Sequence, residues 1–163
     1  MYWVESEFTE QVQLLLGAAD ERLSDAHAVL DGGSPTGSVY LAGYAVELVL
    51  KHAALRVDRA SPTSHPLDAI ATSRARLKPL LGEIDPMSNH GLLFLAVLLQ
   101  AAWRYRHSQV PQVVSEAVNR AKKLNKCWSV DLRYQAGLVA QKDALQFVGE
   151  ARWFVVHAKT LIR

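Results

Sequence analysis

Hydrophobic positions recur every three to four residues along almost the whole chain, and no segment alternates strictly between apolar and polar residues. This period is typical of amphipathic α-helices, because residues three and four apart share one helix face. It predicts helices over residues 5–30, 36 or 38 to 56, 66 to about 81–86, 89–106, 111–125 and 138–162. Long helices joined by short connections predict an all-α fold, an up-and-down bundle of about five to six helices.

Glycine and proline residues mark where these helices end and begin. The segment DGGSPTG, residues 31–37, ends the first helix because two glycines and a proline disfavour its continuation. Pro66 suits the first position of the third helix, and Ser64 or His65 can cap that helix. The segment CWSVDLRYQAG, residues 127–137, has no helical pattern and is expected to be irregular.

The most apolar segment is GLLFLAVLLQAAW, residues 91–103. It is shorter than the roughly 20 apolar residues that a membrane-spanning helix needs. A helix with so few polar residues must lie in the centre of the bundle or at an interface. We therefore expect one domain, residues 1–163, and a homodimer with part of the fourth or the last helix at its interface.

Composition and charge narrow the classes of function without selecting one. The formal net charge is only +2, and the one concentrated basic run, RAKKLNK at residues 120–126, is the best candidate for contacts with an RNA backbone. The single cysteine, Cys127, excludes an internal disulfide and is typical of a cytoplasmic protein. The acidic N-terminal segment lacks the apolar core of a signal peptide. No cluster of residues has metal-ligand spacing, so we expect neither a metal nor a cofactor.

One flank of the second helix carries an unusual polar strip, formed by Tyr40, Tyr44, Glu47 and Lys51. Glu47 precedes Lys51 by four residues, the favourable order for a helical ion pair. Two interpretations are open: an ordinary surface pair, or one wall of a groove beside the core. The second predicts that Glu47 is partly buried and bonded to Arg133 or to the loop at residues 131–134.

The order of several short segments resembles the HEPN domains of prokaryotes. These segments are AGYAVELVLK (42–51), HPLDAI (65–70), WSVDLRY (128–134) and the long last helix, so that the resemblance spans residues 38–162. It implies an α-helical bundle, frequent dimerisation and association with RNA or nucleotides. Many proteins of this family are ribonucleases, as in toxins paired with a nucleotidyltransferase-like antitoxin and in defence effectors, and others lack catalysis. The resemblance therefore allows both a metal-independent ribonuclease and an inactive binding module. The family positions matched in this chain are Glu47, Lys51, His65, Arg133 and Tyr134.

Ribonucleases of this family carry an Arg followed, after four to six residues, by a His. Arg152 and His157 have this spacing, and the pair suits the chemistry: His can move a proton and Arg can hold a phosphate. The same spacing recurs at Arg22–His27 and Arg59–His65, so that spacing alone does not identify a site. Residues five apart on a continuous helix point about 140° apart. Arg152 and His157 are therefore expected to converge only if the helix is broken between them or if a second subunit completes the site.

Structural roles compete with functional ones at the remaining candidates. Arg133 can tie its loop to an acidic residue while the Tyr134 ring packs, His65 can serve as a helix cap, and His52 can be a satisfied core histidine. The rival to RNA or nucleotide binding is a catalytically inactive module that works by protein association, including association with a nucleotidyltransferase-like partner. An Arg and a His converging in a dimer cleft would favour RNA or nucleotide binding. A flat apolar interface without such a cleft would favour the inactive association module.

Overall fold

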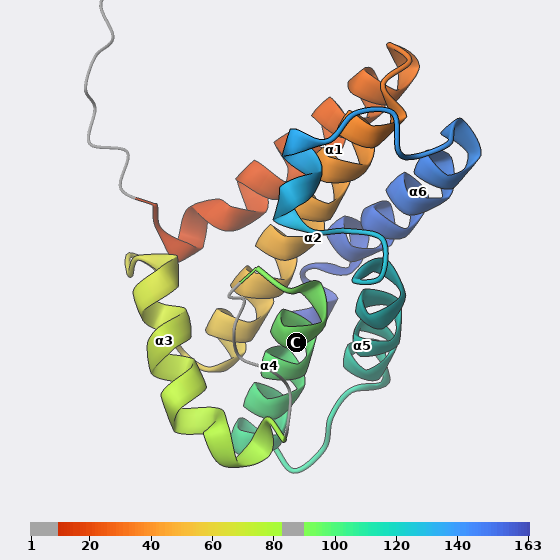
Figure 1. Cartoon of the computed structure of the whole chain (residues 1–163). Coiled ribbons are helices and arrows are strands. Elements are labelled where there is room, and N and C mark those ends of the chain that lie inside the picture. The colour runs from red at the N-terminus through yellow and green to blue at the C-terminus, as the bar shows by residue number, and fades with distance from the viewer. Residues whose placement is uncertain (1–9, 83–89) are drawn as a thin grey trace, which may run out of the picture.

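The computed structural model describes residues 10–82 and 90–163, which form a bundle of helices packed on one another (Figure 1). The α-helices are α1 (Leu15–Asp31), α2 (Pro35–Val57), α3 (Pro66–Leu77), α4 (Leu92–Arg106), α5 (Gln112–Leu124) and α6 (Gln141–His157). Short 3₁₀ turns are η1 (Val12–Leu14), η2 (Lys78–Leu80), η3 (Val130–Tyr134) and η4 (Thr160–Ile162). The described residues contain no β-strand, and the predicted all-α bundle is confirmed.

Several predicted helices extend beyond the observed ones, and backbone contacts explain the later starts of α1 and α6. α6 begins at Gln141 rather than at residue 138, because the N–H groups of Leu138 and Val139 donate to Thr36 Oγ1. α1 begins at Leu15, since the preceding turn donates its backbone N–H groups to the loop before α3. The third helix, predicted to reach about residues 81–86, ends at Leu77, and η2 follows it. α6 ends at His157 rather than at residue 162. The predicted starts at residues 5 and 89 lie outside the described residues.

α2 is the central helix of the bundle. It runs beside α1 as a helical hairpin, α6 packs against both, and α4 packs on α2 with α3 and α5 at its sides (Figure 1). Because neighbours surround α2, most of its residues are buried, including polar ones. The polar strip predicted on this helix therefore lies inside the molecule along much of its length.

The connection between α5 and α6 is fixed to α2 by one buried tryptophan. Trp128 donates from its indole Nε1 to the carbonyl of Tyr40 at 3.1 Å. A Cβ atom at Gly43 would lie only 2.1 Å from the same nitrogen, so that only glycine leaves room for the indole. Gly43 thus decides where η3 lies on the bundle.

The apolar segment at residues 91–103 forms most of α4. It lies in the core of the bundle, which is one of the two locations predicted for it. Leu95, Leu98 and Leu99 are completely buried. The C-terminal segment closes over this helix, where Trp103 Nε1 donates to the carbonyl of Leu161 at 2.9 Å. No helix among the described residues is long and apolar enough to cross a membrane.

His52 lies in the core with an unsatisfied ring nitrogen, contrary to the expectation of a satisfied core histidine. Its Nδ1 is buried and has no hydrogen-bond partner among the described residues. Burial, with a smaller contribution from Arg56, lowers the pKa of His52 to about 4. The folded state therefore favours the neutral ring, which the unfolded chain protonates near its ordinary pKa.

We expect His52 to make stability depend on pH between about 6.5 and 4. Between these pH values the unfolded state binds a proton at His52 that the folded state does not bind. The contribution of neutral His52 to stability is therefore complete above pH 6.5 and decreases as the pH is lowered toward 4. From pH 7 to pH 4.5 the loss should reach about 2–3 kcal/mol. Urea denaturation of wild type and His52→Leu isolates this share as the difference between the two pH profiles. Parallel profiles would show that His52 does not titrate as described.

Candidate functional site

Glu47 and Lys51 form a buried pair, not a surface one. The Glu47 side chain is 0% exposed and Lys51 is nearly as deeply buried. The Lys51 ammonium donates to Glu47 Oε1, and His90 Nδ1 lies 2.7 Å from the same oxygen. The other carboxylate oxygen, Oε2, has no hydrogen-bond partner among the described residues. Buried charges with an unsatisfied acceptor are costly, and they are more frequent at functional sites than elsewhere.

The predicted burial of Glu47 is confirmed, but its predicted partner is wrong. Glu47 pairs with Lys51 and His90, whereas the Arg133 guanidinium lies 4.6 Å from the ring centroid of its neighbour Tyr134. Tyr134 is 74% exposed, so that its ring does not pack into the bundle as expected. The physical reason is Trp128, which fixes this connection over the preceding turn of α2.

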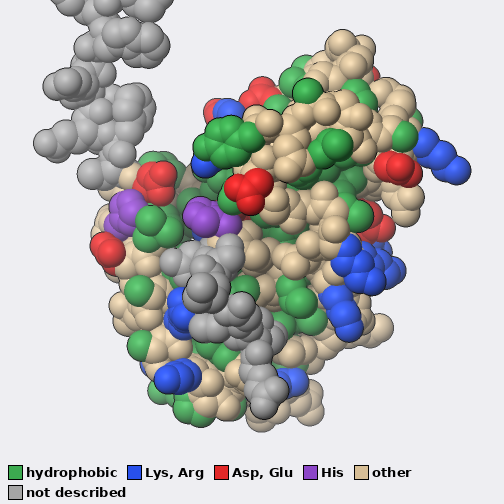
Figure 2. All heavy atoms as spheres, viewed as in Figure 1, with side chains coloured by type: hydrophobic (Ala, Val, Ile, Leu, Met, Phe, Trp, Pro, Cys, Tyr) green, Lys and Arg blue, Asp and Glu red, His purple; other side chains and the backbone are tan. Residues whose placement is uncertain are grey.

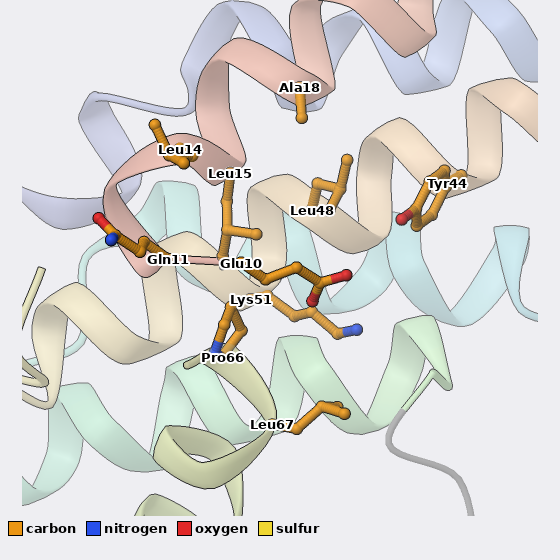
Figure 3. A pocket seen from close by; sticks show the side chains of 10 residues that line it. All are labelled: Glu10, Gln11, Leu14, Leu15, Ala18, Tyr44, Leu48, Lys51, Pro66 and Leu67. Atoms are coloured by element: carbon orange, nitrogen blue, oxygen red, sulfur yellow. The ribbon is translucent and has the colours of Figure 1, made fainter. Parts of the chain in front are cut away.

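A pocket of about 220 Å³ lies beside the buried pair, between η1, α1, α2 and the start of α3 (Figure 3). Its walls are largely apolar, and its polar groups come from α2 and from the segment before η1. The lining residues are Glu10, Gln11, Leu14, Leu15, Ala18, Tyr44, Leu48, Lys51, Pro66 and Leu67. Tyr44 and Lys51 therefore share one pocket wall, as the groove interpretation predicted, while Tyr40 and Glu47 are not among the lining residues.

The pocket offers hydrogen-bond donors and an acceptor against apolar walls. Burial raises the pKa of Tyr44, and the Glu47 and Glu10 carboxylates raise it further, so that its hydroxyl stays protonated. The Lys51 ammonium is a second donor, and the Glu10 carboxylate is an acceptor. Because two carboxylates lie near a single buried ammonium, the pocket does not favour an anion. It suits a small, uncharged, partly apolar ligand with a polar edge.

His65 caps the helix that closes this pocket. Its Nδ1 accepts from the Leu67 N–H at 3.3 Å, which confirms the predicted cap, and its Nε2 lies 3.8 Å from the Glu10 carboxylate. The imidazole thus positions Glu10 and the first turn of α3 together. Its role here is structural support at the edge of the pocket.

Arg152 and His157 do not converge within one chain. Both lie on α6, which is continuous from Gln141 to His157, so their side chains leave the helix about 140° apart. Arg152 is exposed, whereas the His157 ring stacks on Trp153 with centroids 4.4 Å apart. Nδ1 of His157 also lies 2.8 Å from the Trp153 carbonyl, to which it donates. A single chain therefore does not place this Arg and this His on one phosphate.

The basic run at residues 120–126 is only partly available for a ligand. Arg120 is engaged by Glu116 and by Glu150, at 2.5 Å from the latter. Lys122, Lys123 and Lys126 are exposed. Figure 2 shows basic side chains over the α5 side of this face, while acidic and histidine side chains lie near the junction of α1, α2 and α3. The described pocket and the basic surface are thus separate.

Two members of the site were missed at the level of sequence, His90 and Glu10. His90 reaches Glu47 across 43 positions of the chain, and Glu10 lies in a segment predicted as a regular helix. The residues that the structure describes contain no group of three His, Cys, Asp or Glu side chains that could hold a metal ion. The expectation of a metal-free protein remains a prediction.

Comparison of the chain with known protein families, curated proteins and solved structures finds no match. The resemblance to HEPN domains therefore remains a prediction.

Proposed function

We propose that this chain is a helical RNA- or nucleotide-binding module that holds a nucleobase in the pocket between α1, α2 and α3. The observation that carries the proposal is the pocket wall formed by Tyr44 and Lys51, with the buried Glu47 carboxylate, which Lys51 and His90 contact, behind it. The resemblance to HEPN domains points to the same class of ligand. The Glu47–Lys51 pair, which that resemblance singles out, lies at this pocket.

The size and chemistry of the pocket favour a base over a whole nucleotide. At about 220 Å³ it is smaller than the roughly 300–1,000 Å³ typical of sites for drug-sized ligands, so that one ring system fills it. The edge of a base presents donors and acceptors together, and Lys51 and Glu10 offer their complements. Aliphatic side chains on both sides of the pocket can cover the faces of a flat ring. The nearby carboxylates would repel a phosphate, which must then lie outside.

We expect Tyr44→Ala to weaken binding of single-stranded RNA and of ribonucleosides by about 10- to 100-fold, since stacking on an aromatic ring contributes about 1–3 kcal/mol per base. Isothermal titration or ligand-observed NMR with the four ribonucleosides measures this change. Tyr105→Ala is the matched control, because Tyr105 is a half-exposed tyrosine outside the pocket. Equal affinities of Tyr44→Ala and wild type would overturn the proposal, provided that both variants unfold at the same temperature.

An exposed strip on α6 supports a second candidate function, protein association. Leu145 and Val156 are 58% and 66% exposed, and their helical positions place them on the same side as Gly149 and Arg152. A second copy or a nucleotidyltransferase-like partner could cover this strip. Cleavage of RNA by Arg152 and His157 would require such a pairing of two copies. Failure of every nucleoside and RNA to bind, together with a dimer in light scattering, would favour association over nucleobase binding.

A further inference from the structure

A second pocket lies beyond the start of α3, on the turn that joins α2 to α3. It has a volume of about 470 Å³, and polar side chains dominate its lining. The lining residues are Arg59, Ala60, Ser61, Ser64, His65, Asp68, Ala69, Thr72, Ser73 and Arg76. The nucleobase pocket is lined by Pro66 and Leu67 instead, so the two pockets share the first turn of α3 but none of their lining residues.

Arg59 occupies a backbone position that normally belongs to glycine. After α2 ends, Ala60 N–H donates to the Leu55 carbonyl at 2.9 Å and Arg59 N–H to the Arg56 carbonyl at 3.1 Å. These two hydrogen bonds define a Schellman motif. In this motif the first residue beyond the helix cap has a left-handed backbone conformation and is usually glycine. Arg59 has φ of 64°, the one positive φ of a non-glycine residue in the described chain. The strained backbone thus holds a guanidinium at this pocket rather than the residue the turn prefers.

The neighbouring charges leave this corner of the molecule positive. Buried Asp58 is bonded by Arg76, by Ser73 Oγ at 2.6 Å and by Arg106, whose Nη2 lies 3.2 Å from Asp58 Oδ1. Two guanidinium groups therefore face one carboxylate. The Arg59 guanidinium makes no hydrogen bond or ion pair with any other described residue. The lining carboxylate of Asp68 is exposed to solvent.

We propose that this pocket binds a phosphate group, with Arg59 as its principal ligand and the hydroxyls of Ser61 and Ser64 as further donors. Guanidinium groups recognise phosphate through parallel N–H···O bonds. Arg76 also lines the pocket, and its bond to Asp58 fixes its guanidinium in place there. For a nucleotide or RNA ligand the inference rests on the proposed function: the base would occupy the Tyr44–Lys51 pocket and a phosphate this one. Binding of free phosphate would need only the second pocket.

The structure offers a variant that separates binding from folding. Arg59→Gly removes the guanidinium and also relieves the left-handed strain, so it should raise the melting temperature by a few degrees while it abolishes the phosphate contact. Arg59→Asn serves as a second variant, because asparagine tolerates this backbone conformation. Lys142→Gln is the matched control, since Lys142 is an exposed cation at the start of α6.

The experiment titrates each protein with inorganic phosphate, with adenosine and with adenosine 5′-monophosphate, followed by backbone amide NMR shifts. We expect saturable phosphate binding that shifts the amides of residues 59–64 and that falls at least tenfold in Arg59→Gly and Arg59→Asn but not in Lys142→Gln. Adenosine should bind Arg59→Gly as it binds wild type. Phosphate binding that is absent from wild type, or that survives within twofold in both Arg59 variants, would overturn the phosphate site. If wild type binds phosphate but not adenosine, the nucleobase pocket would be overturned and the phosphate site supported.

Discussion

Glu47→Ala is expected to lower the free energy of unfolding by about 3–5 kcal/mol, the largest effect of any single change considered in this protein. Glu47 is completely buried, and its removal leaves the Lys51 ammonium, itself almost completely buried, without its carboxylate. A charge in that environment has little access to water, and its direct carboxylate partner is gone, although Glu10 lines the same pocket. Urea denaturation of wild type and Glu47→Ala at pH 7 measures the change.

The double variant Glu47→Leu/Lys51→Met separates the cost of an unpaired charge from the value of the pair. Replacing both charges with apolar residues of similar size should recover most of the lost stability, because two buried ions are removed together. A melting temperature of Glu47→Ala within a degree of wild type would contradict the account. It would mean that solvent reaches the pair and that Glu47 and Lys51 behave as a surface interaction.

Gly43→Ala is expected to destabilise the bundle by about 3–4 kcal/mol, at or above the upper end of the usual range for an overpacked core. The added Cβ would lie 2.1 Å from Trp128 Nε1 and 2.4 Å from Trp128 Cε2. The indole is buried and cannot move away without breaking its bond to the Tyr40 carbonyl. The segment with η3 should detach, which the fluorescence of Trp128 and the urea midpoint would both report.

Gly149→Ala provides the matched control on another helix. A Cβ at Gly149 meets no atom within 4 Å, so alanine there should add about 0.5–1 kcal/mol of stability through its higher helix propensity. Opposite signs for the two Gly→Ala changes would establish that Gly43 is needed for space rather than for flexibility. Similar effects at both positions would show that Trp128 does not pack against Gly43 as described.

Helical periodicity was sufficient to predict the fold, because most of the helices bury one face and the apolar spacing follows that face, while the central helix α2 is apolar on most sides. The bounds were less predictable where the chain makes contacts far away in sequence. Residues 138–140 read as helix from their composition, but the hydroxyl of Thr36 binds two of their backbone N–H groups. Such a contact is invisible in any short window of the chain.

Half of the candidate site could be predicted in the same way. Glu47 and Lys51 lie one turn apart within an apolar helix, so that both their pairing and their burial follow from local sequence. The partner His90 lies 43 positions away, and the other walls of the pocket come from the first turn of α1 with the segment before it and from α3. Only the packing of three separate segments brings these groups together. Arg133 was the wrong partner because one tryptophan fixes its loop elsewhere.

The most direct test of the proposed nucleobase pocket is the location of a bound ribonucleoside. In a complex with isotope-labelled protein, we expect intermolecular NOEs from the base protons to the Tyr44 ring and to the methyl groups of Leu15 and Leu48, which line the pocket. Amide shifts should centre on residues 44–51 and 65–67. NOEs confined to the exposed lysines of α5 or to the exposed strip on α6, with none to Tyr44 or Leu48, would contradict the account.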